Sequence, residues 1–204
     1  MSSDSGRAPV AGYEYGPDAT QRATDEALTR AADADCLVLV EGITDQIAVE
    51  TVARRLGRDL DDERTVVVPI GGAHAIKHFV PQFVDTGVRL RGLVDHAEAP
   101  YFAEALGVAI DELADRGFHV CDPDLEAELI RAVDPAAIEA LLDANGDLRS
   151  FRTMQKQPNW RGRRFDEQMH RWLRSVSNRG PRYAQALVEA ADDDVPPPLR
   201  AVLG

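Results

Sequence analysis

Acidic residues stand directly after several short apolar runs of this 204-residue chain. Glu41 follows the run 36–40 at once, a later run ends at Asp95, and a fourth is followed by the acidic stretch 122–128. Carboxylates held close together raise one another's pKa or bind a cation, and oxygen ligands suit Mg²⁺ or Mn²⁺. Two such ions about 4 Å apart can clamp a phosphodiester. The candidate metal ligands are Glu41, Asp45, Asp95, Glu98, Asp124 and Glu126.

Helix capping is an alternative role for two of these acids. Asp45 and Asp124 stand where helices are expected to begin, and aspartate is a common helix N-cap. Zinc is disfavoured as the metal, because Cys36 and Cys121 fall inside predicted strands with no histidine at ligand spacing. No Walker-type phosphate loop is present, since the Gly71-Gly72 pair is not followed by Gly-Lys-Ser/Thr.

Alternating strand and helix patterns are expected to position these acids. Continuous apolar runs typical of buried parallel strands alternate with amphipathic stretches, which indicates an α/β fold with a mostly parallel four-stranded sheet flanked by helices. In such sheets ligands bind beyond the carboxyl ends of the strands, where the acids stand. The predicted strands are 36–40, 65–70, 88–94 and 117–121, and the predicted helices are 20–34, 44–56, 74–83, 100–106, 124–132 and 135–144.

The C-terminal third is expected to be a helical appendage. It has no strand pattern, its clearest helices are 165–176 and 182–191, and the three prolines at 196–198 are expected to end regular structure. We therefore predict three parts: a disordered tail over 1–19, an α/β domain over 20–146, and a basic helical extension over 147–204 packed on it.

Charge is distributed unevenly along the chain. The formal net charge is -12, yet residues 149–182 contain ten basic and two acidic residues, a net +8. Such asymmetry is typical of a polyanion-binding surface on an acidic body. An alternative is that these arginines form ion pairs with the protein's own carboxylates. Trp160 also has two open interpretations, a ring that stacks on a base or a residue of the core. No membrane span, secretion signal or disulfide framework is visible, so a cytoplasmic location is expected.

The ordered set of motifs resembles the TOPRIM domain, and more closely the TOPRIM half of the overcoming-lysogenization-defect (OLD) family of endonucleases. The set consists of Glu41-Gly-x-x-Asp45 after a strand, Gly71-Gly72 after the next, an acid after the third, and a late Asp124-Leu125-Glu126. The resemblance covers about 36–132 and implies a TOPRIM-like Rossmannoid fold. It extends less strongly through 149–158.

The resemblance implies roles for individual residues. By position, Glu41, Asp45, Asp95 and Glu126 would hold divalent metal, and Lys156 would join Glu41 in catalysis. The chain departs from the family in two ways. The family has an Asp-x-Asp motif after the third strand, whereas this chain has Ala97 at the position of the second acid, and Glu98 is the nearest acid that could substitute for it. The second departure concerns the ATPase domain that precedes the TOPRIM domain in the large OLD proteins. This sequence is too short to contain one, so the chain is expected to be a stand-alone TOPRIM protein.

Function is expected to be divalent-metal-dependent phosphodiester hydrolysis or nucleotidyl transfer, with Mg²⁺ or Mn²⁺ as cofactor. Nucleic acid is the expected partner, DNA being favoured over RNA, and a partner ATPase is possible. The basic segment would hold the backbone. Two alternatives remain: a TOPRIM module that binds nucleic acid, nucleotide or a partner ATPase without cutting, and a structural acidic domain. The candidate phosphate-binding residues are Gly71, Gly72, Arg152, Arg161, Arg163 and Arg164.

Overall fold

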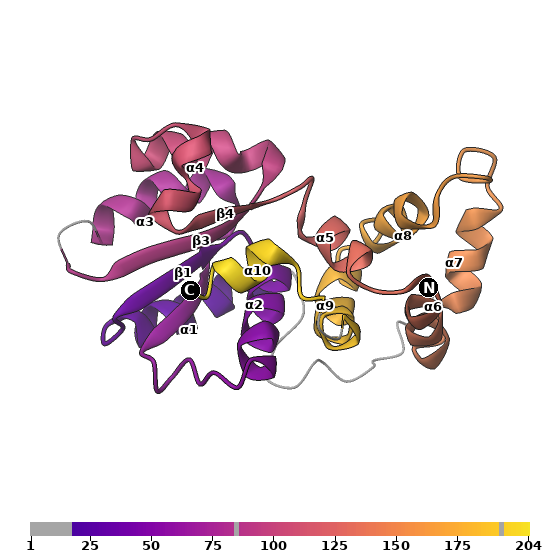
Figure 1. Cartoon of the computed structure of the whole chain (residues 1–204), viewed down its shortest axis with the longest axis horizontal. Coiled ribbons are helices and arrows are strands. Elements are labelled where there is room, and N and C mark those ends of the chain that lie inside the picture. The colour runs from indigo at the N-terminus through magenta and orange to yellow at the C-terminus, as the bar shows by residue number, and fades with distance from the viewer. Residues whose placement is uncertain (1–17, 84–85, 192–193) are drawn as a thin grey trace.

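A four-stranded, all-parallel sheet forms one half of the molecule in the computed structural model, which describes residues 18–83, 86–191 and 194–204 (Figure 1). The strands lie in the order β2-β1-β3-β4. Their bounds are β1 (Cys36–Val40), β2 (Thr65–Pro69), β3 (Arg89–Asp95) and β4 (Phe118–Cys121). Both the parallel arrangement and the four strand positions predicted from the apolar runs are confirmed.

Helices cover both faces of this sheet, as the fully buried strands β1 and β2 require. Alternate side chains of β1 enter two different cores: Leu37 and Leu39 face one side, and Val38 and Val40 face the other. The first core is completed by α1 (Ala19–Ala31), α3 (Ile76–Phe83) and α4 (Ala99–Leu106). The second is completed by α2 (Ile43–Arg55), α10 (Pro197–Ala201) and the helices that follow β4.

A group of five helices, α5–α9, forms the other half of the molecule (Figure 1). One continuous core joins them to α2, with Trp172 and Tyr183 among the largest fully buried side chains. The predicted boundary at 146/147 falls inside this group, because α5 and α6 pack against α7, α8 and α9. The group consists of α5 (Leu125–Arg131), α6 (Pro135–Ala144), α7 (Leu148–Gln155), α8 (Phe165–Leu173) and α9 (Arg179–Ala190).

Some elements begin or end differently from the pattern in the sequence. The stretch predicted as one helix over 74–83 is a 3₁₀ turn over Ala73–Ala75 followed by α3. The prediction that the prolines at 196–198 end regular structure is wrong, because α10 begins at Pro197. Proline fits the first helical turn, where its missing N–H would have no partner in any case. Apart from residues 18 and 19, the predicted tail over 1–19 lies outside the described residues.

Short 3₁₀ turns complete the connections between these elements. They are η1 (Ala73–Ala75), η2 (His96–Glu98), η3 (Ile110–Glu112) and η4 (Ala114–Arg116). None of the helices in the described part of the chain is long and apolar enough to cross a membrane.

Candidate functional site

Glu41 leaves the end of β1 into a turn that is built by the two glycines after β2. The backbone N–H groups of Gly71 and Gly72 both donate to the carbonyl oxygen of Glu41, at 3.1 Å each. Both glycines have positive φ, 77° and 110°, which other residues adopt only with strain. Their N–H groups are therefore occupied within the turn, so the predicted binding of phosphate by Gly71 and Gly72 cannot use these donors.

Asp45 lies in the first turn of α2, one turn beyond Glu41. Its Oδ2 accepts a hydrogen bond of 3.0 Å from the backbone N–H of Gly42, which holds the carboxylate beside the end of β1. The N-cap of α2 is Gly42, not Asp45 as its position in the sequence suggested, and Asp45 accepts this bond from the third helical position. The same carboxylate also lines an open cavity at the sheet edge, so the capping bond fixes its position there.

Asp95 and Glu126 reach the same edge from β3 and α5. Asp95 is the last residue of β3, and its Oδ1 accepts from the backbone N–H of Leu125 at 3.1 Å. That bond ties the start of α5, and with it Glu126, to the end of β3. Two acids separated by 31 positions in the sequence are thereby held at one place.

Glu98 belongs to the 3₁₀ turn η2, which follows β3, and it lies beside Glu41. Contact with the Glu98 carboxyl is one of the causes that raise the pKa of Glu41. The Oε2 atom of Glu98 is buried and has no hydrogen-bond partner among the described residues. Ala97, at the position of the missing second acid, is exposed. Glu98 is therefore close to Glu41, and its role as the substitute for the missing acid stays a prediction.

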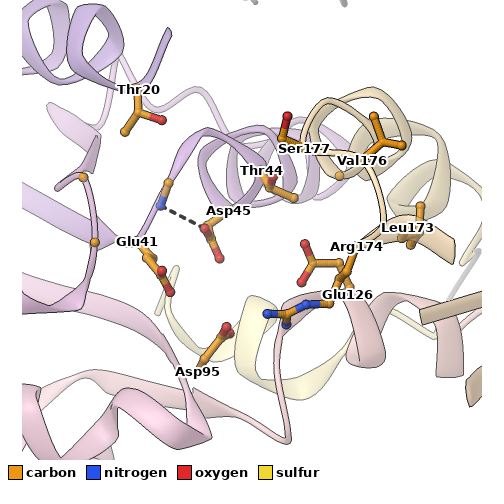
Figure 2. A pocket seen from close by; sticks show the side chains of 14 residues that line it. Thr20, Glu41, Thr44, Asp45, Asp95, Glu126, Leu173, Arg174, Val176 and Ser177 are labelled. Carbon is orange, nitrogen blue, oxygen red and sulfur yellow. Dashed lines mark hydrogen bonds between the residues drawn. The ribbon is translucent and has the colours of Figure 1, made fainter. Parts of the chain in front are cut away.

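The open cavity has a volume of about 470 Å³ and collects four of these carboxylates (Figure 2). Glu41, Asp45, Asp95 and Glu126 point into it from three elements of the sheet half and from α5. The opposite wall comes from the helical group. The lining residues not predicted from the sequence are Thr20, Gly42, Thr44, Leu173, Arg174, Val176, Ser177 and Gly180.

Burial and mutual repulsion raise the pKa values of the acids in this cavity. Burial raises the pKa of Glu41 to about 9, with Glu98, Asp45 and Asp95 adding to the shift. Burial and the charges of Asp95 and Glu126 raise the pKa of Asp45 to about 8. Burial, together with Asp124 and Glu126, raises the pKa of Asp95 to about 7. Burial, followed by the Asp124 charge, raises the pKa of Glu126. Without a cation, Glu41 and Asp45 therefore retain protons at neutral pH.

Asp124 differs from the other acids because it already has partners. It caps α5 through a 2.9 Å bond from the backbone N–H of Ala127, as its position before the helix predicted. Its Oδ2 lies 2.7 Å from His170 Nε2, and it also forms an ion pair with Arg174. Although burial raises it, these partners hold the pKa of Asp124 below its usual value. Asp124 thus serves to join α5 to α8, and only displacement of these partners would free it as a metal ligand.

Arg174 is the charged residue among the cavity-lining residues that were not predicted from the sequence. It follows α8, pairs with the buried Asp124 and lines the cavity next to Glu126 (Figure 2). Its side chain remains 52% exposed, so the guanidinium can still meet a ligand. The excess of basic residues over 149–182 included Arg174, but nothing in the sequence distinguished it from nine other cations.

Lys156 is not brought to the carboxylates. It is exposed at the end of α7, which lies at the opposite end of the molecule's long axis from the sheet (Figure 1). The predicted nucleic-acid-binding arginines also lie outside the cavity, and several have partners within the protein. Arg152 pairs with Glu139, Arg163 with Glu167 and Arg164 with Asp166, while Arg161 donates to the Lys156 carbonyl.

The acids do not form a closed metal cage. Within residues 18–83, 86–191 and 194–204, no group of three or more His, Cys, Asp or Glu side chains is arranged to hold a metal ion. Mg²⁺ does not need such a cage, because it commonly keeps several waters and binds one or two carboxylates together with substrate phosphates. The raised pKa values and the orphaned Glu98 oxygen fit a cation bound in this open manner.

Comparison with known proteins agrees with the fold. Residues 34–96 match the family model described as "Overcoming lysogenization defect protein-like, TOPRIM domain". No curated protein matches the chain. The C-terminal region of the Burkholderia pseudomallei OLD protein superposes with a TM-score of 0.62 at 19% identity, covering 83% of this chain and 95% of that one.

A second solved structure gives the same result. The C-terminal region of the Xanthomonas campestris pv. campestris OLD protein has a TM-score of 0.62 at 17% identity, covering 85% of this chain and 92% of that one. At such identities the likeness concerns the fold, and it extends beyond the matched segment into the helical group. The chain therefore contains an OLD-like TOPRIM domain and resembles the C-terminal regions of OLD proteins in its fold.

Proposed function

We propose that this protein hydrolyses a nucleic-acid phosphodiester in a reaction that depends on Mg²⁺ or Mn²⁺. The observation that carries the proposal is the convergence of four carboxylates with raised pKa values on one open cavity, at the carboxyl edge of an OLD-like TOPRIM sheet. A DNA substrate is favoured over RNA on the resemblance alone, and a partner ATPase remains a prediction of the same kind.

The carboxylates are the proposed metal ligands. Glu41, Asp95 and Glu126 would hold the ion, with Asp45 and Glu98 as further ligands from the flanking turns. A bound divalent ion supplies charge stabilisation on the phosphate and lowers the pKa of a bound water. The chain itself positions these groups through the capping bond to Gly42 and the bond from Leu125 to Asp95.

Arg174 is the proposed phosphate contact at this site. A guanidinium presents several donors in a planar fork that matches phosphate oxygens, and Arg174 keeps about half of its side chain exposed beside Glu126. Its pairing with Asp124 orients it toward the cavity and leaves other N–H groups for a ligand. In this proposal Arg174 performs the role that the resemblance assigned to Lys156.

A cleavage panel with a matched pair of variants tests the proposal. Supercoiled DNA, single-stranded DNA and structured RNA are each incubated with Mg²⁺, Mn²⁺ or EDTA. We expect metal-dependent cleavage of at least one substrate and a loss of at least ~100-fold in Glu41→Gln, in the range expected when an ion's ligand is removed. Glutamine mimics the protonated Glu41, so the fold should survive. The control, Glu104→Gln, changes an exposed carboxyl on α4 away from the cavity.

A non-catalytic binding module is the second candidate, favoured by the exposed Ala97 at the position of a family acid. Calorimetric titration with Mg²⁺ separates the two. Heat of binding that disappears in Glu41→Gln, without cleavage of any substrate in the panel, would support the binding module and overturn the hydrolase. Cleavage that is equal in wild type and Glu41→Gln would exclude this cavity as the reacting site.

A further inference from the structure

A second open cavity, of about 560 Å³, lies wholly within the helical group. Its walls come from the α6–α7 turn, α7, the segment before α8, α8 and the start of α9. Three arginines, three hydroxyl side chains and Trp160 line it, and no Asp or Glu of the described residues is among its lining. These polar residues are Arg149, Ser150, Thr153, Arg171, Ser175 and Arg179. In a protein of net charge -12, a cavity with three arginines and no carboxylate is a concentrated positive site.

Arg179 lines this cavity with its guanidinium held by several contacts. Its guanidinium carbon lies 3.8 Å from the centroid of the Trp172 ring, and Trp172 is fully buried. Nη1 donates to the Trp172 carbonyl at 2.8 Å and to Ser175 Oγ at 2.6 Å, while Nη2 donates to Ser150 Oγ at 3.3 Å. All these partners are neutral, so the contacts fix the position of the charge without cancelling it.

Arg149 and Arg171 provide the exposed part of the positive site. Both side chains are exposed, and no ion pair is formed by either with a carboxylate in the described part of the chain. Neighbouring arginines of the same basic segment behave differently, since Arg152, Arg163, Arg164 and Arg182 each pair with an acid. Asp147, the acid whose charge acts on Arg179, is itself bonded to Arg182 and Tyr183.

The two cavities are neighbours across the turn between α8 and α9. Val176 lines both of them. Arg174 and Ser177, on the same turn, face the carboxylates, whereas Ser175 and Arg179 face the arginine cavity. A polymer that lies over this turn can therefore touch both sites at once, which a single small anion cannot do.

We propose that the arginine cavity binds backbone phosphates of the same nucleic-acid strand whose phosphodiester reaches the carboxylates. The proposal rests on the proposed function for the identity of the strand, and on the cavity's own residues for the phosphate chemistry. Arginine binds phosphate through paired N–H donors, and the neighbouring hydroxyls add further donors. Trp160, half-buried at the same cavity, offers an aromatic surface of the kind on which unpaired bases stack. The expected occupant is a single strand.

Fluorescence anisotropy with a labelled single-stranded DNA oligonucleotide tests the proposal, in EDTA so that no cleavage occurs. We expect Arg149→Gln/Arg171→Gln to weaken binding at least ~10-fold at low salt. It should also reduce the slope of log K against log salt by about 1.4, because each phosphate contact on a single strand contributes about 0.7. The matched control is Arg89→Gln/Arg116→Gln. It removes the same charge from two exposed arginines at the amino ends of β3 and β4, the sheet edge opposite the carboxylates.

Each outcome has a defined meaning. Equal weakening in both double variants shows only a non-specific charge effect and overturns the proposal, and so does unchanged affinity in Arg149→Gln/Arg171→Gln. A mononucleotide that binds as tightly as the oligonucleotide would assign the cavity to a free nucleotide and also overturn it. Failure of the proposed function is separate: binding that depends on Arg149 and Arg171, without cleavage by wild type, would retain this inference and remove the hydrolase.

Discussion

The carboxylate cavity at the sheet edge and the arginine cavity of the helical group concentrate charge of opposite sign within one chain, on the two sides of the α8–α9 turn. At the sheet edge, burial and the charges of neighbouring acids raise the pKa values of these carboxyls, so part of their charge is neutralised by protons. In the helical group the cations cannot release protons, because arginine stays charged at any pH that proteins tolerate. The charge of the carboxylate cavity should therefore change with pH and with bound metal, whereas ligand binding at the arginine cavity should change with salt concentration.

Asp124 shows where the two regions meet. It belongs by sequence to the acidic set, yet its partners His170 and Arg174 come from the basic segment, 46 and 50 positions later. Its pKa is lowered, whereas the pKa values of its acidic neighbours are raised. Acids that lie close together, such as Asp124 and Glu126, therefore have pKa values shifted in opposite directions. Changes of pH, of metal and of single side chains should affect the two regions differently, and we expect the change of pH to have the largest effect.

Metal-free stability should fall as pH rises from about 5 to 9. Glu41, Asp45 and Asp95 keep their protons to pH values of about 9, 8 and 7 when folded, but lose them near pH 4 when unfolded. Between those limits the folded state binds more protons than the unfolded state, so the free energy of unfolding falls as pH rises. Chemical denaturation in EDTA at a series of pH values measures this slope.

Mg²⁺ should counteract this loss, and increasingly so at higher pH, because the ion competes with protons for the same oxygens. Denaturation with saturating Mg²⁺ at pH 6 and pH 8.5 gives the comparison. A metal-independent slope, or a stabilisation by Mg²⁺ that is larger at pH 6, would contradict the assignment of these acids as ligands. The arginine double variant should show the same pH slope as wild type, since that cavity is lined by no acid from the part of the chain that the structure describes.

Substitution of Arg174 should reduce cleavage activity much more than substitution of Lys156. Arg174→Gln is expected to lower kcat about 10- to 100-fold by removing the guanidinium beside Glu126. Lys156→Gln should stay within about threefold of wild type, because Lys156 lies outside the cavity. Single-turnover cleavage at saturating substrate measures both, and thermal melting checks that Asp124, still bonded to His170 and Ala127, keeps the fold of Arg174→Gln intact. The opposite ranking would restore Lys156 as the catalytic cation.

Gly180 should give the smallest effect. A Cβ atom at this position of α9 would lie 3.0 Å from Thr44 Oγ1 and 3.3 Å from Glu126 Oε1, so Gly180→Ala presses on the carboxylate wall. We expect Mg²⁺ affinity to fall a few-fold, while the free energy of unfolding changes by less than ~1 kcal/mol because alanine favours the helix. Calorimetry and denaturation measure the two quantities. Gln185→Ala, further along α9, is the control that should leave Mg²⁺ affinity unchanged.

Much of the sheet half could be predicted from the sequence for a simple reason. Strands buried on both faces are continuous apolar runs, so the first polar residue after each run marks the edge of the sheet. Glu41 and Asp95 were found in this way, and parallel strands necessarily bring those ends to the same side. The helical group carried less information, because amphipathic helices show which face is apolar but not which helix it meets.

What the sequence determined by itself was therefore local: the strands, the acids at their ends, the turn glycines and the concentration of positive charge after residue 148. Only the tertiary structure decided which cations are cancelled by acids and which remain open. It paired Asp124 with His170 and Arg174 and placed Arg174, but not Lys156, at the carboxylate cavity. It also left Arg149 and Arg171 around a cavity that no described acid lines. The physical reason is that ion pairing acts over a few ångströms in space, whereas the partners are tens of residues apart along the chain.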